Sequence, residues 1–221
     1  MKILELFSGS RSIGKVAESR GHRVFSIDNQ DFPDTDWVGD VREFDVNQLP
    51  FIPDVIWASP PCTGFSVARI GRNWVQGEPF TPKTETAKLG IELLNITLII
   101  IRHYSKLNPN LRWFIENPRG KMRKSPDLQP GQGLIRHTVS YCKYGDTRMK
   151  PTDIWTNYGG WLPKEMCRPF KYDDKGNVID KHCHHDASPR GTQNGGTQKL
   201  KGNYERSKIP QQLCEEIIDS L

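Results

Sequence analysis

Three short apolar runs in this chain each end in small, acidic or sulfur-containing residues, and this repeated pattern constrains the fold more than any other feature. The runs span 3–7, 54–58 and 111–115, and they lead into Ser8-Gly9-Ser10, Ser59-Pro60-Pro61-Cys62 and Glu116-Asn117-Pro118. Apolar residues at helical spacing predict helices over 12–20 and 85–105. Such an alternation of strands and helices is typical of a parallel α/β sheet, which binds ligands beyond the carboxyl ends of its strands.

The rest of the chain extends this sheet. A further strand is predicted over 24–27, ending at Asp28, and strand-like runs at 137–141 and 153–156 predict an antiparallel pair at one edge. We expect Ser12 to cap the first helix. The buried face of the long helix is expected to contain Leu89, Leu93, Ile96 and Ile100.

The composition changes after residue 156. Residues 157–207 are rich in glycine and lack apolar periodicity, whereas 208–221 again show the spacing of an amphipathic helix. We therefore expect three parts: an α/β domain over 1–156, a loop-rich insert over 157–207, and a C-terminal helix over 208–221 that returns to the first domain.

Composition narrows the class of protein. The 221 residues have a formal net charge of +5, which is compatible with a polyanionic partner. Five widely spaced cysteines do not form the dense, even set of a secreted disulfide framework, so a reducing cytoplasm is expected. No stretch approaches the length of a membrane span, and no signal peptide is recognised at the N-terminus.

The turn after the first apolar run has the features of a cofactor loop. Gly9 and Gly14 stand where a strand passes into a helix, and glycine there lets the backbone approach a ligand closely. Asp28 follows about 20 residues later, where an acidic side chain can bind ribose hydroxyls. The pair favours a nucleoside-containing cofactor over a purely structural turn. The glycine spacing does not fit the dinucleotide fingerprint, which disfavours NAD and FAD.

Cys62 and Glu116 are the residues most suited to catalysis. A cysteine held between prolines and a loop at a strand end can present a thiolate to an electrophile, although a lone cysteine is more often a buried structural residue. Glu116 ends another strand, and a carboxyl group shielded by Trp113 and Pro118 could act as an acid toward a ring nitrogen.

With these residues in place, the chain resembles the C5-cytosine DNA methyltransferases over most of its length. Glu5-Leu6-Phe7-Ser8-Gly9 is similar to their first motif, Pro61-Cys62 to the nucleophile motif, and Glu116-Asn117 to the glutamate motif. The segment from Tyr144 to Lys150 resembles the eighth motif, and Arg206-Ser207-Lys208-Ile209-Pro210 a reduced final motif. The resemblance implies a Rossmann-like, S-adenosylmethionine-dependent α/β fold with helices on both faces of the sheet.

The resemblance also assigns expected roles to individual residues. Cys62 would be the nucleophile that adds to cytosine C6, Glu116 would act at N3, and Arg148 and Lys150 would orient the base and its phosphate. Asp28 would bind the ribose and Asp40 the adenine of S-adenosylmethionine. The full set of expected cofactor-binding residues is Phe7, Ser8, Gly9, Ser10, Asp28, Asp40 and Pro60.

Three features depart from the family pattern. Thr63 stands where glutamine is usual, the ninth motif is not recognisable, and only about 50 loop-rich residues replace a large target-recognition domain. The 65–84 loop is therefore expected to carry part of the DNA contact, together with the basic segment 199–208. The expected DNA-binding residues are Arg69, Arg72, Trp74, Arg119 and Lys121.

Several alternatives stay open at this stage. The chain could be a catalytically impaired DNA-binding protein with this fold, or could methylate RNA or a free nucleotide; methylation of an exocyclic amino group fits Cys62 and Glu116 less well. Cys167 with His182-Cys183-His184-His185 has ligand types for zinc but lacks paired spacing, so we expect no metal there. We expect a monomer that acts on DNA in a bacterial cytoplasm, in a setting that includes phage and other mobile elements.

Overall fold

The computed structural model describes residues 1–131, 133–167, 171–180, 200 and 202–221. Its strands are β1 (Lys2–Leu6), β2 (Arg23–Asp28), β3 (Trp37–Val38), β4 (Val55–Ala58), β5 (Arg112–Pro118), β6 (Ile135–Ser140), β7 (Pro151–Thr156), β8 (Lys171–Tyr172) and β9 (Val178–Asp180). Its α-helices are α1 (Ser12–Ser19), α2 (Ile70–Asn73), α3 (Glu85–Leu107), α4 (Gly202–Ser207) and α5 (Gln211–Asp219).

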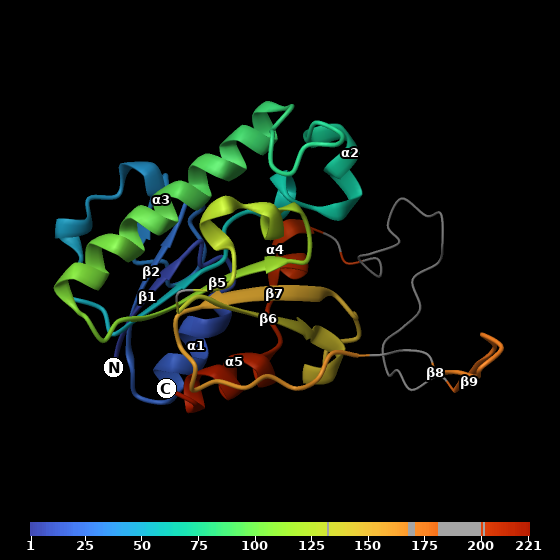
Figure 1. The fold of residues 1–221 in the computed structure, drawn as a ribbon. Helices are drawn as coiled ribbons and strands as arrows, with labels where there is room; N and C mark the ends of the chain where they lie inside the picture. The colour runs from blue at the N-terminus through green and yellow to red at the C-terminus, as the bar shows by residue number, and fades with distance from the viewer. Residues whose placement is uncertain (132, 168–170, 181–199, 201) are drawn as a thin grey trace.

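Seven strands form one mixed sheet in the order β3-β2-β1-β4-β5-β7-β6. The first five of these are parallel to their neighbours, and β7 pairs antiparallel with both β5 and β6. Helix α3 covers one face, and α1 and α5 cover the other (Figure 1). The structure therefore confirms the expected α/β fold and the antiparallel pair at one edge.

Alternation along the strands builds two cores, one on each face of the sheet. In β1, Leu4 and Leu6 join the core beneath α3, whereas Ile3 joins the core beneath α1 and α5. Leu213 and Ile217 of α5 are buried in the second core, as the sequence pattern predicts. Helix α5 packs on this second core and begins at Gln211 instead of 208.

Two local predictions are wrong. Leu89 is 41% exposed, although it was predicted to be buried. The N-terminal part of α3 packs through Ala87 and Gly90 against the loop that follows β4. Because successive residues of a helix are rotated by about 100° around its axis, Leu89 points away from this contact. Ser12 is the first residue of α1; Arg11 is the N-cap, with a left-handed backbone and no side-chain cap. The Ser12 hydroxyl instead accepts a hydrogen bond from the Ile209 N–H at 3.2 Å.

The region predicted as an insert contains more regular structure than expected. Strands β8 and β9 pair with each other in a sheet separate from the main one, and α4 lies near its end (Figure 1). The division of the chain at residues 156 and 207 stays a prediction.

A buried ion pair joins the edge strands to the segment after β5. Arg123, in the 3-10 helix η5 (Lys121–Lys124), donates through Nε and Nη2 to the carboxylate of Asp153 on β7. Asp153 is fully buried and also accepts from the Thr138 hydroxyl of β6 at 2.7 Å. A buried carboxylate stabilises the fold only while the groups that bind it, here Arg123 and Thr138, remain in place.

We predict that Asp153→Ala lowers the free energy of unfolding by about 3 to 5 kcal/mol, because it leaves the Arg123 guanidinium without its carboxylate. The matched control is Asp127→Ala, which removes the exposed ion pair between Asp127 and Arg102 and should cost below about 1 kcal/mol. Urea unfolding of both variants checks this; equal losses would contradict a special role for the buried pair.

Candidate active site

The carboxyl ends of β1, β2, β4 and β5 lie along one edge of the sheet. From β1 the chain first adds β2 and β3 on one side and then crosses back to place β4 on the other. A change of direction of this kind leaves a crevice beyond the strand ends, where open α/β sheets bind their ligands. The expected cofactor residues and the expected catalytic residues follow strands on the two sides of this point.

The loop after β1 has an unusual backbone. Phe7, Gly9 and Arg11 have φ angles of 57°, 48° and 52°, in the left-handed region that residues other than glycine rarely adopt. The Gly9 N–H donates to Asp28 Oδ2 at 2.8 Å, so the ends of β1 and β2 are held together. Strain of this kind is retained where the surroundings impose it, often at ligand sites.

The loop has groups that fit a nucleoside cofactor. The Ser8 hydroxyl is buried and has no hydrogen-bond partner within the described parts of the chain. Asp28 is half-buried, with Oδ1 accepting from the Gln30 N–H, and its carboxylate keeps lone pairs for ribose hydroxyls. Ser10 and Ser12 share a hydrogen bond of 2.7 Å, and Pro60 is buried at the end of β4.

Asp40 is already engaged in this structure. Its carboxylate is bound by the Arg42 guanidinium, with Nη2 to Oδ2 at 2.6 Å, and it caps a short 3-10 helix through the Arg42 N–H. These bonds lower the pKa of Asp40. Contact with an adenine amino group would use the lone pairs that Arg42 leaves free.

The buried carboxyl group of Glu5 supports the loop that follows β1. Glu5 on β1 is 2% exposed, and its Oε2 accepts from the Gly14 N–H at 3.2 Å. Burial raises the pKa of Glu5 to about 7, opposed by the Gly14 hydrogen bond and by the charge of Arg11. A Cβ at Gly14 would lie 2.5 Å from that oxygen, so Gly14 is needed for close approach.

The Cys62 loop is fixed to the end of β5. The Asn117 side chain is fully buried, and its Nδ2 donates to the Pro60 carbonyl at 2.8 Å. A 3-10 helix begins at Cys62, whose carbonyl accepts from the Phe65 N–H at 3.0 Å. The next residues pair with the segment after β5, since the Lys121 N–H donates to the Phe65 carbonyl at 2.8 Å.

Two neighbouring charged side chains, Glu116 and Lys150, act on the Cys62 sulfur. The side chain is exposed to solvent, yet the protein atoms around the sulfur raise the pKa of the thiol, and the Glu116 charge raises it further. The ammonium group of Lys150 lowers this pKa and therefore favours the thiolate. The structure thus brings together Cys62, Glu116 and Lys150 from the ends of β4, β5 and the loop before β7.

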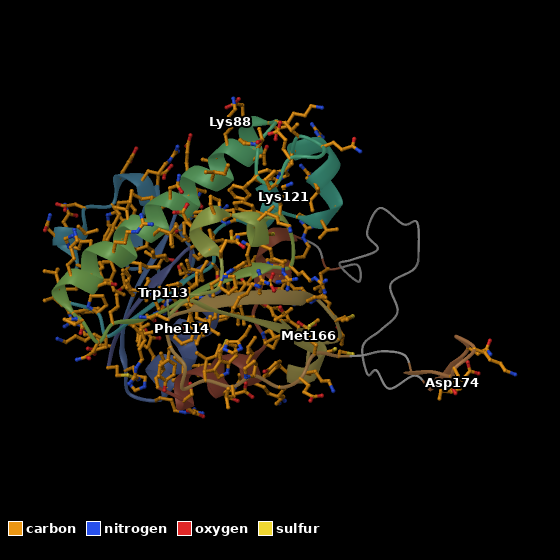
Figure 2. The ribbon with its side chains drawn as sticks, viewed as in Figure 1. Lys88, Trp113, Phe114, Lys121, Met166 and Asp174 are labelled. Atoms are coloured by element: carbon orange, nitrogen blue, oxygen red, sulfur yellow. The ribbon has the colours of Figure 1, made fainter. Side chains whose placement is uncertain are left out.

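Glu116 is 5% exposed, but Trp113, one of the two residues predicted to shield it, does not cover it. Trp113 lies on the opposite face of β5, because side chains alternate along a strand, and it packs with the core beneath α3 (Figure 2). Tyr141, the first residue of the 3-10 helix η7 (Tyr141–Tyr144), covers Glu116 instead. Its hydroxyl donates to Glu116 Oε1 at 2.9 Å.

Arg148 and Lys150 both contact the last turn of α4. Arg148 is 6% exposed, pairs with Asp146 and donates through Nη1 to the Arg206 carbonyl at 3.0 Å. Lys150 Nζ donates to the same carbonyl at 3.2 Å. The two expected base-orienting residues therefore also hold the segment that resembles the final motif.

The expected DNA-binding residues divide into two groups. Arg69, Arg72 and Arg119 are exposed beside the Cys62 loop. Trp74 differs from the expectation: it is 2% exposed, packs against Phe65 and Phe80, and donates to the Gly64 carbonyl at 2.8 Å, so it forms the small core of the loop. Lys121 lies against this loop (Figure 2) and donates to the Glu78 carbonyl at 3.0 Å.

Other predictions fall wholly or partly outside the described residues. His182, Cys183, His184 and His185 lie there, as do Lys199 and Lys201 of the basic segment. Cys167 is buried, and its N–H donates to the Ser140 hydroxyl. Where the chain is described, no helix combines the length and the apolar character needed to cross a bilayer.

Sequence reasoning assigns no role to Tyr141, which contacts Glu116, or to Arg11, which lies two residues after Gly9. The sequence pattern places Tyr141 at the end of an edge strand, and nothing local in the sequence indicates its contact with Glu116, because that contact depends on the order of β5, β7 and β6. Arg11, in the loop after β1, is 3% exposed and pairs with Glu18. Nothing in the sequence around Arg11 indicates that its side chain is buried.

Comparison with known proteins gives a full-length relative. The chain is 32% identical over 231 residues to the "Probable DNA (cytosine-5)-methyltransferase" of Frog virus 3 (isolate Goorha), and the match covers 99% of each of the two chains. No protein-family model matches.

Solved structures that resemble the chain are longer proteins. A methyltransferase from Entamoeba histolytica has a TM-score of 0.51 at 13% identity, over 75% of this chain and 56% of that one, which shows the fold alone. A DNMT2 variant from Spodoptera frugiperda has a TM-score of 0.44 at 18% identity, with the same coverage. The chain therefore spans a little over half the length of these solved proteins.

The buried carboxyl of Glu5 predicts a pH dependence of stability. With a folded pKa of about 7 against 4.5 in the unfolded chain, its contribution is fully present below pH 4.5 and is lost as the pH rises to about 7. The stability of Glu5→Gln relative to wild type should therefore rise by about 2 to 3 kcal/mol between pH 5 and pH 8. Urea unfolding at both pH values measures the difference.

The matched control is Glu85→Gln on the exposed start of α3, which should follow the wild-type pH dependence. A difference between Glu5→Gln and wild type that stays constant with pH would show that Glu5 does not titrate in this range.

Proposed function

Since the chain belongs to the DNA (cytosine-5)-methyltransferase family, we propose that it transfers a methyl group from S-adenosylmethionine to C5 of cytosine in DNA, through a covalent bond between Cys62 and cytosine C6. The proposal rests on the arrangement of Cys62, Glu116 and Lys150. Their charges act on one another at the carboxyl ends of the strands, beside the glycine loop. Each of the three has a distinct chemical task in the reaction.

The reaction begins at the cysteine. Cytosine C5 is a weak nucleophile until a group adds at C6, and a thiolate is well suited to that addition. The Lys150 ammonium favours the thiolate of Cys62, and Asn117 holds the loop that carries it. As the Sγ–C6 bond forms, N3 takes a proton from the Glu116 carboxyl group, and C5 becomes the nucleophilic end of an enamine.

The residues after β1 and β2 suit the cofactor. S-adenosylmethionine supplies an electrophilic methyl group on a sulfonium. Asp28 would accept hydrogen bonds from its ribose, and the buried Ser8 hydroxyl would gain the partner it lacks. Phe7, Gly9, Ser10, Asp40 and Pro60 complete the proposed pocket. Ser207, the last residue of α4, comes close to Gly9, so the end of α4 would cover the pocket.

The target base has to leave the helical stack before its ring face can meet the thiol. We place the DNA across the exposed side of the Cys62 loop, with Arg69, Arg72 and Arg119 contacting phosphates. Lys121 and Trp74 would support this loop from inside. Once the methyl group is on C5, loss of the C5 proton to a base breaks the Sγ–C6 bond and restores the thiolate.

Trapping of the covalent intermediate tests the proposal. In duplex DNA in which 5-fluorocytosine replaces every cytosine of one strand, C5 has no proton to lose, so wild type should form an adduct that resists denaturation when S-adenosylmethionine is present. Cys62→Ala should form none, and Glu116→Gln should trap at least about a hundredfold more slowly, as expected for loss of a general acid.

Peptide mass spectrometry locates the adduct, and the same duplex with ordinary cytosine is the control for trapping. An adduct at Cys142, or methylation by Cys62→Ala, would overturn the mechanism. Label transfer to RNA or dCTP, with none to DNA, would retain the chemistry and change the acceptor.

A second test addresses the cofactor pocket. Asp28→Ala should weaken S-adenosylmethionine binding by about tenfold or more, because it removes an ionised acceptor for the ribose and frees the Gly9 N–H. The matched control is Asp54→Ala, which removes a carboxylate that accepts the Lys2 N–H at the opposite end of the sheet and should bind cofactor as wild type does. Calorimetry measures both affinities; equal affinities for the two variants would exclude Asp28 from the pocket.

A further inference from the structure

We propose that Tyr141 is a positioning residue for Glu116: its hydroxyl holds Oε1 as the accepting oxygen and thereby leaves Oε2 to carry the proton toward cytosine N3. This inference rests on the proposed function, since it assigns a role within the same reaction. It starts from one contact, the hydrogen bond of 2.9 Å from the Tyr141 hydroxyl to Glu116 Oε1.

The hydrogen bond lies inside the protein and has a fixed direction. Tyr141 is fully buried and Glu116 is 5% exposed, so water competes little for either group. Burial and the neighbouring Glu116 charge raise the pKa of Tyr141 well above its usual value, so the phenol keeps its proton and acts as the donor. Oε1 therefore accepts a hydrogen bond in both protonation states of the carboxyl group.

The ring of Tyr141 is itself held by the loop that contains the expected base-orienting residues. The Tyr141 N–H donates to the Met149 carbonyl at 2.8 Å. Lys150 Nζ lies 4.6 Å from the ring centroid and the Arg148 guanidinium carbon 6.0 Å, both within the range of cation–π attraction. Glu116 is thus oriented through Tyr141 by the same loop that is proposed to orient the base.

The consequence for the reaction is a defined proton path. When the Cys62 thiolate bonds to C6, the C5=C6 electron pair moves toward C4 and the C4=N3 pair takes up the proton from Oε2, leaving Glu116 as a carboxylate. The Tyr141 hydroxyl then stabilises that carboxylate at Oε1, a charge-assisted hydrogen bond stronger than the one to the neutral acid. When the thiolate leaves, the proton returns from N3 to Oε2.

Tyr141→Phe tests this role, because it deletes one oxygen and keeps the ring and its cation contacts. We expect adduct formation with 5-fluorocytosine DNA to slow by about tenfold or more, as for loss of a hydrogen bond to a charged group. The Kd values for DNA and for S-adenosylmethionine should not change. The matched control is Tyr104→Phe on α3, which removes the hydroxyl of another buried tyrosine, bonded to the Val46 carbonyl, and should trap at the wild-type rate.

A double-variant comparison separates positioning from general support of the fold. If Tyr141 acts through Glu116, then Tyr141→Phe should slow trapping little or not at all when Glu116→Gln is already present. Equal slowing in both backgrounds, or wild-type trapping by Tyr141→Phe alone, would overturn the inference. Thermal unfolding of each variant shows whether it is folded, and weakened cofactor binding by Tyr141→Phe would also count against a positioning role.

The outcomes for the two proposals are distinguishable. Absence of any adduct with wild type is a failure of the proposed function. A wild-type adduct at Cys62 that forms equally fast with Tyr141→Phe is a failure of this inference alone.

Discussion

The hydrogen bond from Asn117 Nδ2 to the Pro60 carbonyl joins the two strand ends on which the site depends. Strands β4 and β5 are already paired from Val55↔Arg112 to Ala58↔Ile115, but that pairing stops before Cys62 and Glu116. The buried amide continues the connection past the end of the ladder. The Cys62 thiol on an otherwise exposed loop thereby keeps a constant position relative to the Glu116 carboxyl group on a rigid strand, as the proposed attack on one ring by both groups requires.

Much of the fold follows from local patterns in the sequence. Apolar runs that end in glycine, proline or acidic residues predicted β1, β2, β4 and β5, and helical spacing predicted α1, α3 and α5. These patterns are reliable because each strand of a buried parallel sheet needs apolar side chains on both faces. The strand ends then place Gly9, Asp28, Cys62 and Glu116 at one edge without further information.

The errors come from contacts between distant segments. The face of α3 that is buried depends on the close approach of Gly64 and Gly90, which shifts the core side of the helix away from Leu89. Trp74 reads as an exposed loop aromatic until Phe65 and Phe80 are seen to enclose it. Tyr141 is 25 residues from Glu116 in sequence, and only the order of β5, β7 and β6 brings them together.

The two outer strands of the sheet, β3 and β6, affect how readily the protein aggregates in concentrated solution. Strand β3 has only two residues, so the outer edge beyond it offers almost no free backbone for a neighbouring chain to pair with. At the other end, β6 carries Arg136 and His137 in adjacent positions, and polar or charged side chains there discourage a second strand from docking. The sheet is therefore protected at both edges against edge-to-edge aggregation.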